Sequence, residues 1–136
     1  MDYEINYDVT NALFIIKIIG GFELAKFESL CSDLIAAPLW RAGSNCIFDY
    51  REASLTHMSR NDLYGKISVL LSHKDGLGNG KMAMIAKDQL NFGMSRMFQL
   101  MAESNMVGLD IGVFYDVPST EAWIKNDQSV KDPSLD

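Results

Sequence analysis

The chain has 136 residues, of which 48% are hydrophobic and 22% charged, the balance of one ordinary soluble domain. Its 12 basic and 18 acidic residues give a net charge of −6, which argues against sequence-independent nucleic-acid binding and against docking on an anionic membrane by charge alone. Only 2 His and 2 Cys are present, so few metal sites or nucleophile–base pairs can be built. This scarcity excludes most hydrolase and metalloenzyme classes.

The N-terminus is acidic where a signal peptide would be basic, and the apolar stretch 12–19 is far shorter than a membrane-spanning helix. Cys31 and Cys46 form no CxxC motif, and each lies among apolar residues, which favours buried, reduced thiols. We therefore expect a cytoplasmic protein without stable membrane insertion.

The first half of the chain alternates between strand and helix patterns. Residues 3–7 predict a strand with one wet face, and the apolar run 12–19 predicts a second strand that pairs with it as a hairpin and ends at Gly20. A helix that ends before Pro38 is predicted next. Its apolar face consists of Phe27, Leu30, Cys31, Leu34 and Ile35. The apolar run within 44–50 then predicts a central strand.

The second half begins with a predicted helix whose N-cap is Ser59, because a carboxylate follows three residues later at Asp62. We expect that helix to stop at the glycine-rich stretch 76–80. Its apolar face consists of Leu63, Ile67, Leu70 and Leu71. Residues 82–86 are apolar throughout, as in a parallel strand covered on both sides.

Asp88 is predicted to cap a helix over 89–104, in which Gly93 hints at close packing. The predicted buried stripe of this helix consists of Leu90, Met94, Met97, Phe98 and Met101. Alternation over 109–115 predicts another strand, and a final helix near Pro118 is expected to bury Trp123.

These elements follow the order β-β-α-β-α-β-α-β-α. The strand–helix–strand units favour parallel pairing, so we expect a mixed α/β sheet, mostly parallel with an antiparallel N-terminal strand and with helices packed on it. One domain over 1–126 and a disordered tail over 127–136 are predicted.

The sequence offers few carriers of catalysis. The glycines of 76–80 follow a helix and precede a strand, the reverse of a phosphate-binding loop, so we interpret them as a helix stop. His57 and His73 lack a HExxH frame and are interpreted as solvated or capping residues. GxSxG motifs and spaced carboxylate pairs are also missing from the sequence. We expect no catalytic residue, no cofactor and no metal.

The methionine-rich helix allows two interpretations. Spacing of this kind is typical of plain core packing. The same side chains could instead line an adaptable partner groove or a lipid-binding cavity, because thioethers fit irregular shapes. The residues concerned are Met94, Met97, Phe98 and Met101.

Several segments together resemble bacterial SpoIIAA-like proteins. They are 38–43 (PLWRAG), 46–53 (CIFDYREA), 92–98 (FGMSRMF), 113–114 (VF) and 121–124 (EAWI). The resemblance spans about 3–125 and places the chain beside the STAS domains (sulfate transporter and anti-sigma-factor antagonist). It implies a small α/β module, usually without catalytic activity, that acts by binding; some relatives are described alongside lipid-binding Sec14-type domains.

The resemblance also implies a possible phosphorylation switch. Classical antagonists carry a phosphorylated serine in an Asp-Ser-Ser-Gly sequence, which this chain lacks. Ser59 is the nearest hydroxyl, with Arg60 beside it as a possible phosphate partner. Ser59 can equally be a plain N-cap.

Two functions from different classes follow. The first is a non-catalytic module that binds a protein partner through the loop 51–57 and the start of the next helix. The residues assigned to that surface are Arg51, Glu52, His57, Ser59 and Arg60. The alternative is a small-molecule or lipid carrier that uses the methionine face. A homodimer is also predicted as an option, because Tyr3 and Tyr7 could extend an edge or cover a neighbouring sheet.

Overall fold

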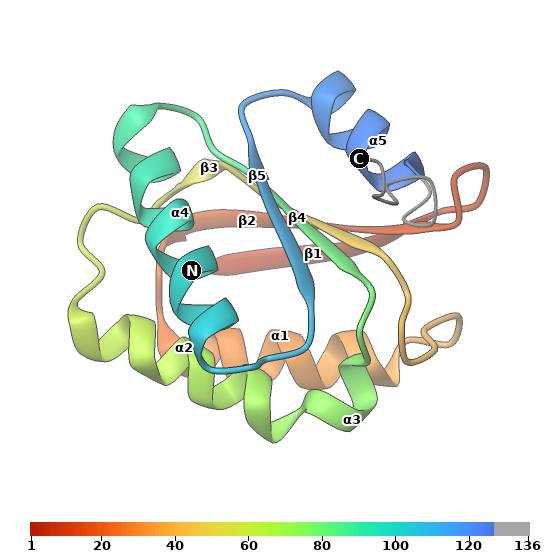
Figure 1. Ribbon diagram of the computed structural model, residues 1–136, viewed down its shortest axis with the longest axis horizontal. Helices are drawn as coiled ribbons and strands as arrows, with labels where there is room; N and C mark the ends of the chain where they lie inside the picture. The colour runs from red at the N-terminus through yellow and green to blue at the C-terminus, as the bar shows by residue number, and fades with distance from the viewer. Residues whose placement is uncertain (127–136) are drawn as a thin grey trace, which may run out of the picture.

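The computed structural model describes residues 1–126, where five strands form one sheet and five helices pack against it (Figure 1). The strands are β1 (Asp2–Asp8), β2 (Leu13–Gly21), β3 (Cys46–Ser54), β4 (Lys81–Ile85) and β5 (Asp110–Phe114). The helices are α1 (Leu24–Ala36), α2 (Arg60–Ser72), α3 (Lys74–Leu77), α4 (Gln89–Ser104) and α5 (Val117–Lys125). The predicted element order is confirmed, with α3 added, and the predicted tail, 127–136, lies outside the described residues.

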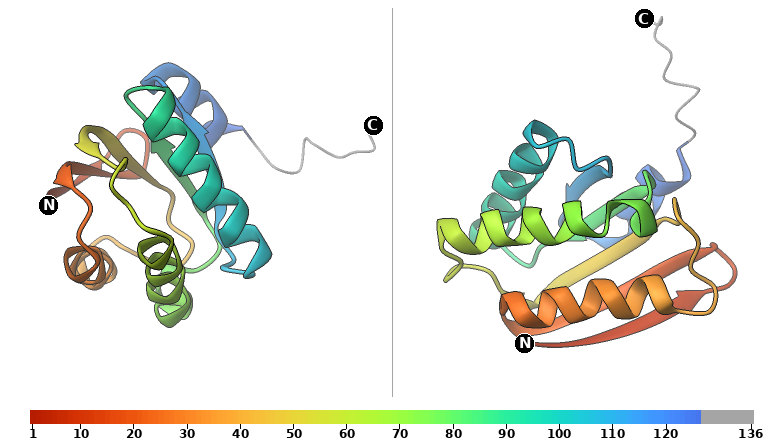
Figure 2. Two further views of the ribbon diagram at one scale, coloured as in Figure 1. Left: turned by 90° about the vertical axis from the view of Figure 1, so that its left-hand side faces the viewer. Right: turned by 90° about the horizontal axis from the view of Figure 1, so that it is seen from below.

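The strands lie side by side in chain order, with β1 antiparallel to β2 and every other neighbouring pair parallel. The predicted mixed sheet is therefore confirmed. Strands that are added in sequence through right-handed crossovers carry their helices on the same face. Accordingly α1, α2 and α4 lie on one face of the sheet, and α5 covers part of the other (Figures 1 and 2).

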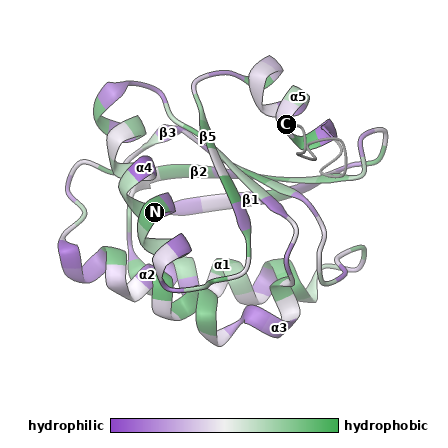
Figure 3. Cartoon of the chain, in the orientation of Figure 1, coloured by the Kyte–Doolittle hydropathy of each residue, from purple (hydrophilic) through white to green (hydrophobic). Residues whose placement is uncertain are grey.

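Two hydrophobic cores lie on the two faces of the sheet. The main core lies beneath α1, α2 and α4 and includes Phe14 and Phe48, whereas Ile47 and Ile85 pack beneath α5 with Trp123. All of β4 is buried, as its apolar sequence predicts. In Figure 3 the inner strand β2 is coloured mostly hydrophobic. Cys31 and Cys46 are free and buried, as expected.

Several predicted boundaries are wrong. Gly20 does not end β2, because the strand continues through Gly21 and pairs with Ala53 and Ser54 of β3. The glycine stretch does not end α2 either, since that helix stops at Ser72 and α3 follows. On α2 the predicted apolar residue Leu71 is exposed, while Lys66 and Val69 are buried.

The predicted buried stripe of α4 is also wrong. Phe98 is buried, but Leu90 is 71% exposed and Met97 48% exposed, and Met94 and Met101 are only half-buried. The residues that α4 buries are Asn91, Ser95, Phe98 and Ala102. The helix is therefore rotated so that small and polar side chains face the sheet and its methionines lie beside α2.

The tyrosines of β1 face the main core rather than a neighbouring molecule. The Tyr3 hydroxyl donates a hydrogen bond to Asp33 of α1 at 2.6 Å, and the Tyr7 ring packs on Phe14 at 4.7 Å between centroids. These rings are therefore not free to cover a neighbouring sheet. The β1 strand lies at an edge of the sheet, so extension of that edge, and with it a homodimer, stays a prediction. Within 1–126, no helix is long and apolar enough to cross a membrane.

Lys66 of α2 is 2% exposed and lies in a cage of aromatic rings. Its Nζ donates a hydrogen bond to the Tyr50 hydroxyl of β3 at 2.9 Å. Nζ is 4.2 Å from the ring centre of Phe98, 5.1 Å from that of Phe27 and 5.9 Å from that of Phe22. Because burial removes the ammonium from water, it lowers the pKa of Lys66 to about 7.

The buried amine makes stability depend on pH. The unfolded chain keeps the Lys66 proton up to about pH 10.4, so between about pH 7 and that value the unfolded state binds more protons than the folded state. The contribution of Lys66 to the free energy of unfolding should therefore rise with pH in this window, by about 1.6 kcal/mol from about pH 7 to about pH 8.5. Below about pH 7 Lys66 is protonated in both the folded and the unfolded state, so it no longer makes the free energy of unfolding depend on pH.

Urea denaturation at about pH 7 and about pH 8.5 tests whether Lys66 causes this pH dependence. The natural sequence is compared with the double variant Lys66→Met/Tyr50→Phe, which removes both members of the Lys66–Tyr50 hydrogen bond. We expect the double variant to lose the rise, and the control Tyr50→Phe to keep it. Burial also raises the pKa of Cys31 and of Cys46 in the folded state. Both thiols are about half ionised in the unfolded chain at about pH 8.5, which lowers the rise by the same amount in all three proteins. The contribution of Lys66 is therefore the difference between the natural sequence and the double variant. Equal pH slopes in the natural sequence and the double variant would contradict the assignment.

Candidate functional site

A hollow of about 430 Å³ lies between the start of α2 and the middle of α4. Its lining residues are Met58, Arg60, Leu63, Tyr64, Met94, Met97 and Met101. A second hollow of about 330 Å³ adjoins it, because both are lined by Met94 and Met97. The other residues of the second hollow are Thr56, Gln89, Leu90 and Gly93. We call the two hollows together the methionine groove.

The orientation of α4 that opens this groove is fixed at both ends of the helix. Near its start, the Asn91 side chain accepts a hydrogen bond from the Leu55 N–H at 2.8 Å and donates one to Asp88 at 2.7 Å. Further along, Gln99 donates to the carbonyl of Ile111 in β5 at 2.6 Å. Rotating α4 to bury the methionines would break both contacts.

The start of α2 forms the other wall of the groove. The Ser59 hydroxyl accepts a hydrogen bond from the Asp62 N–H at 3.0 Å, and the Asp62 carboxylate accepts one from the Ser59 N–H at 2.8 Å. This reciprocal capping box confirms the predicted N-cap and fixes the first turn. Arg60 in that turn is exposed, and its side chain has no hydrogen-bond or ion-pair partner among residues 1–126.

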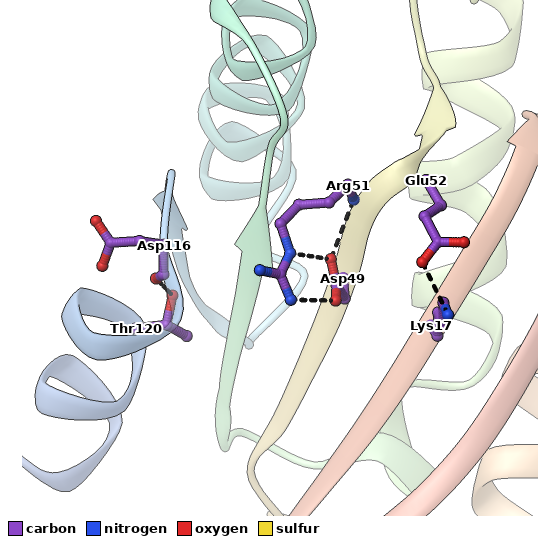
Figure 4. Close-up of polar contacts among 6 residues, drawn as sticks. All are labelled: Lys17, Asp49, Arg51, Glu52, Asp116 and Thr120. Atoms are coloured by element: carbon purple, nitrogen blue, oxygen red, sulfur yellow. Dashed lines mark hydrogen bonds and ion pairs between the residues drawn. The ribbon is translucent and has the colours of Figure 1, made fainter.

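Arg51 and Glu52 do not join this site. They lie on the other face of the sheet, where Arg51 donates two side-chain hydrogen bonds to the Asp49 carboxylate and Glu52 forms an ion pair with Lys17 at 2.8 Å (Figure 4). Burial alone would raise the pKa of Asp49, but the hydrogen bonds from Arg51 outweigh it and lower that pKa. Both predicted residues are therefore engaged in local ion pairs.

Figure 4 also shows where α5 begins on that face. Asp116 caps the helix by accepting a hydrogen bond from the Ser119 N–H at 2.8 Å, and the Thr120 hydroxyl donates to the Asp116 carbonyl at 2.7 Å. At the other end of α5, Lys81 donates to the carbonyls of Trp123 and Asn126, each at 2.7 Å. These contacts hold α5 in place and serve structure rather than a site.

The structure thus divides the residues predicted from the sequence into two groups. Arg60 of the predicted partner surface lies beside the predicted apolar residues Met94, Met97 and Met101, and Phe98 lies buried beneath them. His57 and Ser59 are exposed in the adjoining loop and cap. As members of a site, sequence reasoning missed Met58, Leu63 and Tyr64 in the first hollow and Gln89, Leu90 and Gly93 in the second. Leu63 and Tyr64 could have been found from the sequence. They lie three and four residues after Arg60, so they share one face of the helix with it.

The groove carries little titratable chemistry. Arg60 is its one charged lining residue within 1–126, and the remainder are apolar or neutral. Across the same residues, no group of three or more His, Cys, Asp or Glu side chains could hold a metal ion. The groove is an open apolar surface between two helices, with the cation of Arg60 beside it. Such a surface is suited to binding an apolar segment that carries a negative charge.

No protein-family model matches the chain, and no curated protein is similar to it in sequence. Among solved structures, it is similar to the crystal structure of an uncharacterized protein from the DUF3478 family with a SpoIIAA-like fold, from Shewanella loihica PV-4. The TM-score is 0.61, with 90% of this chain and 92% of the other covered at 14% sequence identity. The fold is SpoIIAA-like. The fold expected from the sequence resemblance is confirmed, and likeness at this identity extends to the fold alone.

Gly93 offers a direct test of how α4 is oriented. The sequence suggested close packing there, yet a Cβ atom at this position would have no neighbour within 4 Å. Gly93→Ala should therefore stabilise the protein by about 0.5–1 kcal/mol, because alanine favours the helix and meets no obstacle. Urea denaturation measures the change.

Gly112→Ala serves as the matched control, since a Cβ atom at that position would lie 2.8 Å from the Phe114 ring. We expect this second substitution to destabilise the protein. Destabilisation by Gly93→Ala of similar size would show that Gly93 is packed against another element, and that the groove is wrongly placed.

Proposed function

We propose that the protein is a non-catalytic, STAS-like binding module that holds a protein partner against the methionine groove and the start of α2. The groove itself carries the proposal, because Leu90 is 71% exposed and Met97 48% exposed. Arg60, whose side chain has no partner among residues 1–126, lines the same groove. Grouped apolar side chains on a surface often mark interaction sites. The SpoIIAA-like fold supports the proposal, since the resemblance implies modules that act by binding. A cytoplasmic location is part of the same proposal.

The proposed surface differs from the one expected from the sequence alone. Arg51 and Glu52 are paired on the opposite face, so they are left out. His57, Ser59 and Arg60 remain, because all three are exposed at the edge of the groove. The methionines then supply the apolar part that the loop alone does not offer.

A carrier for a small amphiphile is the second candidate, and the apolar lining of the groove favours it. The two hollows, of about 430 and 330 Å³, lie within the usual size range of small-molecule sites. Such sites normally bury most of their ligand, however, and this groove is open along Met97 and Leu90. The open shape therefore supports a protein partner better than an enclosed lipid.

Phosphorylation of Ser59 would switch this surface by a specific physical route. The Ser59 hydroxyl and Asp62 are joined in the capping box, so a phosphate there would be placed beside the Asp62 carboxylate. Repulsion would open the box, while Arg60 could pair with the added charge. Intact-mass analysis of protein from the native host should then show an added phosphate under some growth condition, and an unmodified mass under all conditions would contradict the switch.

Site-specific cross-linking tests the proposed function. A photoreactive amino acid replaces Met97 in the groove, or Leu39 as the control, since Leu39 is 59% exposed and lies outside the groove. Irradiation in the native host should give a discrete protein adduct from position 97 and none from position 39. The same adducts from both positions, or a lipid mass attached at position 97, would contradict the proposal.

A further inference from the structure

We propose that the occupant of the methionine groove is a single amphipathic helix of the partner, with an apolar stripe that packs on α4 and an acidic side chain that meets Arg60. The inference rests on the proposed function, because it names the chemistry of the partner at that same surface. Three observations carry it: the spacing of the α4 side chains, the shape of the opposite wall, and the distribution of charge.

The apolar residues of α4 that line the groove are spaced as in a helix–helix seam. Leu90, Met94, Met97 and Met101 are separated by 4, 3 and 4 residues. This alternation keeps side chains on one line along a helix, and in coiled coils the line is covered by a second helix. From Leu90 to Met101 the stripe is about 16 Å long, which matches about three turns of a partner helix.

The wall opposite α4 presents a matching set of side chains. Leu63 and Tyr64 of α2 lie one turn from Arg60 and line the same hollow, and Met58 lies at the end of the preceding loop. A partner helix placed here would contact α2 on one side and α4 on the other, as in helix-in-groove recognition. Methionine side chains suit that role, because their flexible thioethers adapt to the apolar residues of a partner.

Charge distinguishes an acidic helix from a basic one. The chain has a net charge of −6, so its general surface repels acidic partners. Within the described residues the groove departs from that pattern, since its lining contains no carboxylate and its single charged residue is Arg60. An exposed arginine that has no acidic partner among residues 1–126, at the edge of an apolar surface, complements a carboxylate on the occupant.

Two synthetic helical peptides of about 15 residues provide the probe. Both carry leucine at the 4-3-4 spacing, and they differ only in the flanking positions, which are glutamate in one peptide and lysine in the other. Fluorescence anisotropy measures their binding to the full chain. We expect the glutamate peptide to bind at least about tenfold more tightly than the lysine peptide, a difference of about 1.4 kcal/mol.

Two variants place the binding in the groove. Arg60→Glu should reverse the order of the two peptides, whereas Arg41→Glu, an equal charge change at an exposed position outside the groove, should leave the order unchanged. Met97→Asp should abolish binding of the glutamate peptide, whereas Leu39→Asp should not. All four positions are exposed, and circular dichroism checks that each variant is folded.

The outcomes separate this inference from the proposed function. Equal affinity for both peptides, or an unchanged order of affinities in Arg60→Glu, overturns the inference that the partner helix is acidic. If Met97→Asp still abolishes peptide binding in that case, the groove remains the proposed docking surface. Binding that survives Met97→Asp overturns the groove as the docking surface. Displacement of the bound peptide by micromolar laurate overturns the inference of a partner helix and supports a carrier for a small amphiphile instead.

Discussion

The buried amine of Lys66 joins the three elements on which the groove depends. It bonds Tyr50 of β3 at 2.9 Å and lies 4.2 Å from the ring centre of Phe98 on α4. This contact holds α2 and α4 together at depth, directly above the sheet. Nearer the surface the two helices are separated by the methionine groove.

Strand order explains why such a groove exists in this fold. Four parallel strands in sequence place α1, α2 and α4 in a row on one face, and the last two of these helices flank the groove. The polar contacts of Asn91 and Gln99 then hold α4 in an orientation that exposes Met97. Arg60 lies at the edge because the Ser59 cap begins α2 at that point. Packing geometry and one cation together produce a surface for binding.

Local signals predicted the fold well, and tertiary contacts decided the site. The caps at Ser59 and Asp88 and the alternation of β1 depend on neighbours in sequence, so they could be found without a structure. The orientation of α4 could not be predicted from neighbours in sequence. It depends on the buried Asn91 side chain, which accepts a hydrogen bond from the N–H of Leu55, a residue 36 positions away. Lys66 is buried for a similar reason, and hydrophobic patterns assign such residues to solvent.

The central claim is that Met94, Met97 and Met101 of α4 line an open groove, while Met94 and Met101 also pack against the main core. Oxidation by dilute hydrogen peroxide, followed by peptide mass spectrometry, tests it directly on the full chain, because the rate of sulfoxide formation follows exposure. Met106, which is 76% exposed and lies outside the groove, should oxidise fastest and serves as the exposed reference. Met97, which is 48% exposed, should follow, then Met94 and Met101, with Met82 and Met84, at 1% and 0%, slowest of all. Protection of Met94, Met97 and Met101 equal to that of Met82 and Met84 would contradict the account.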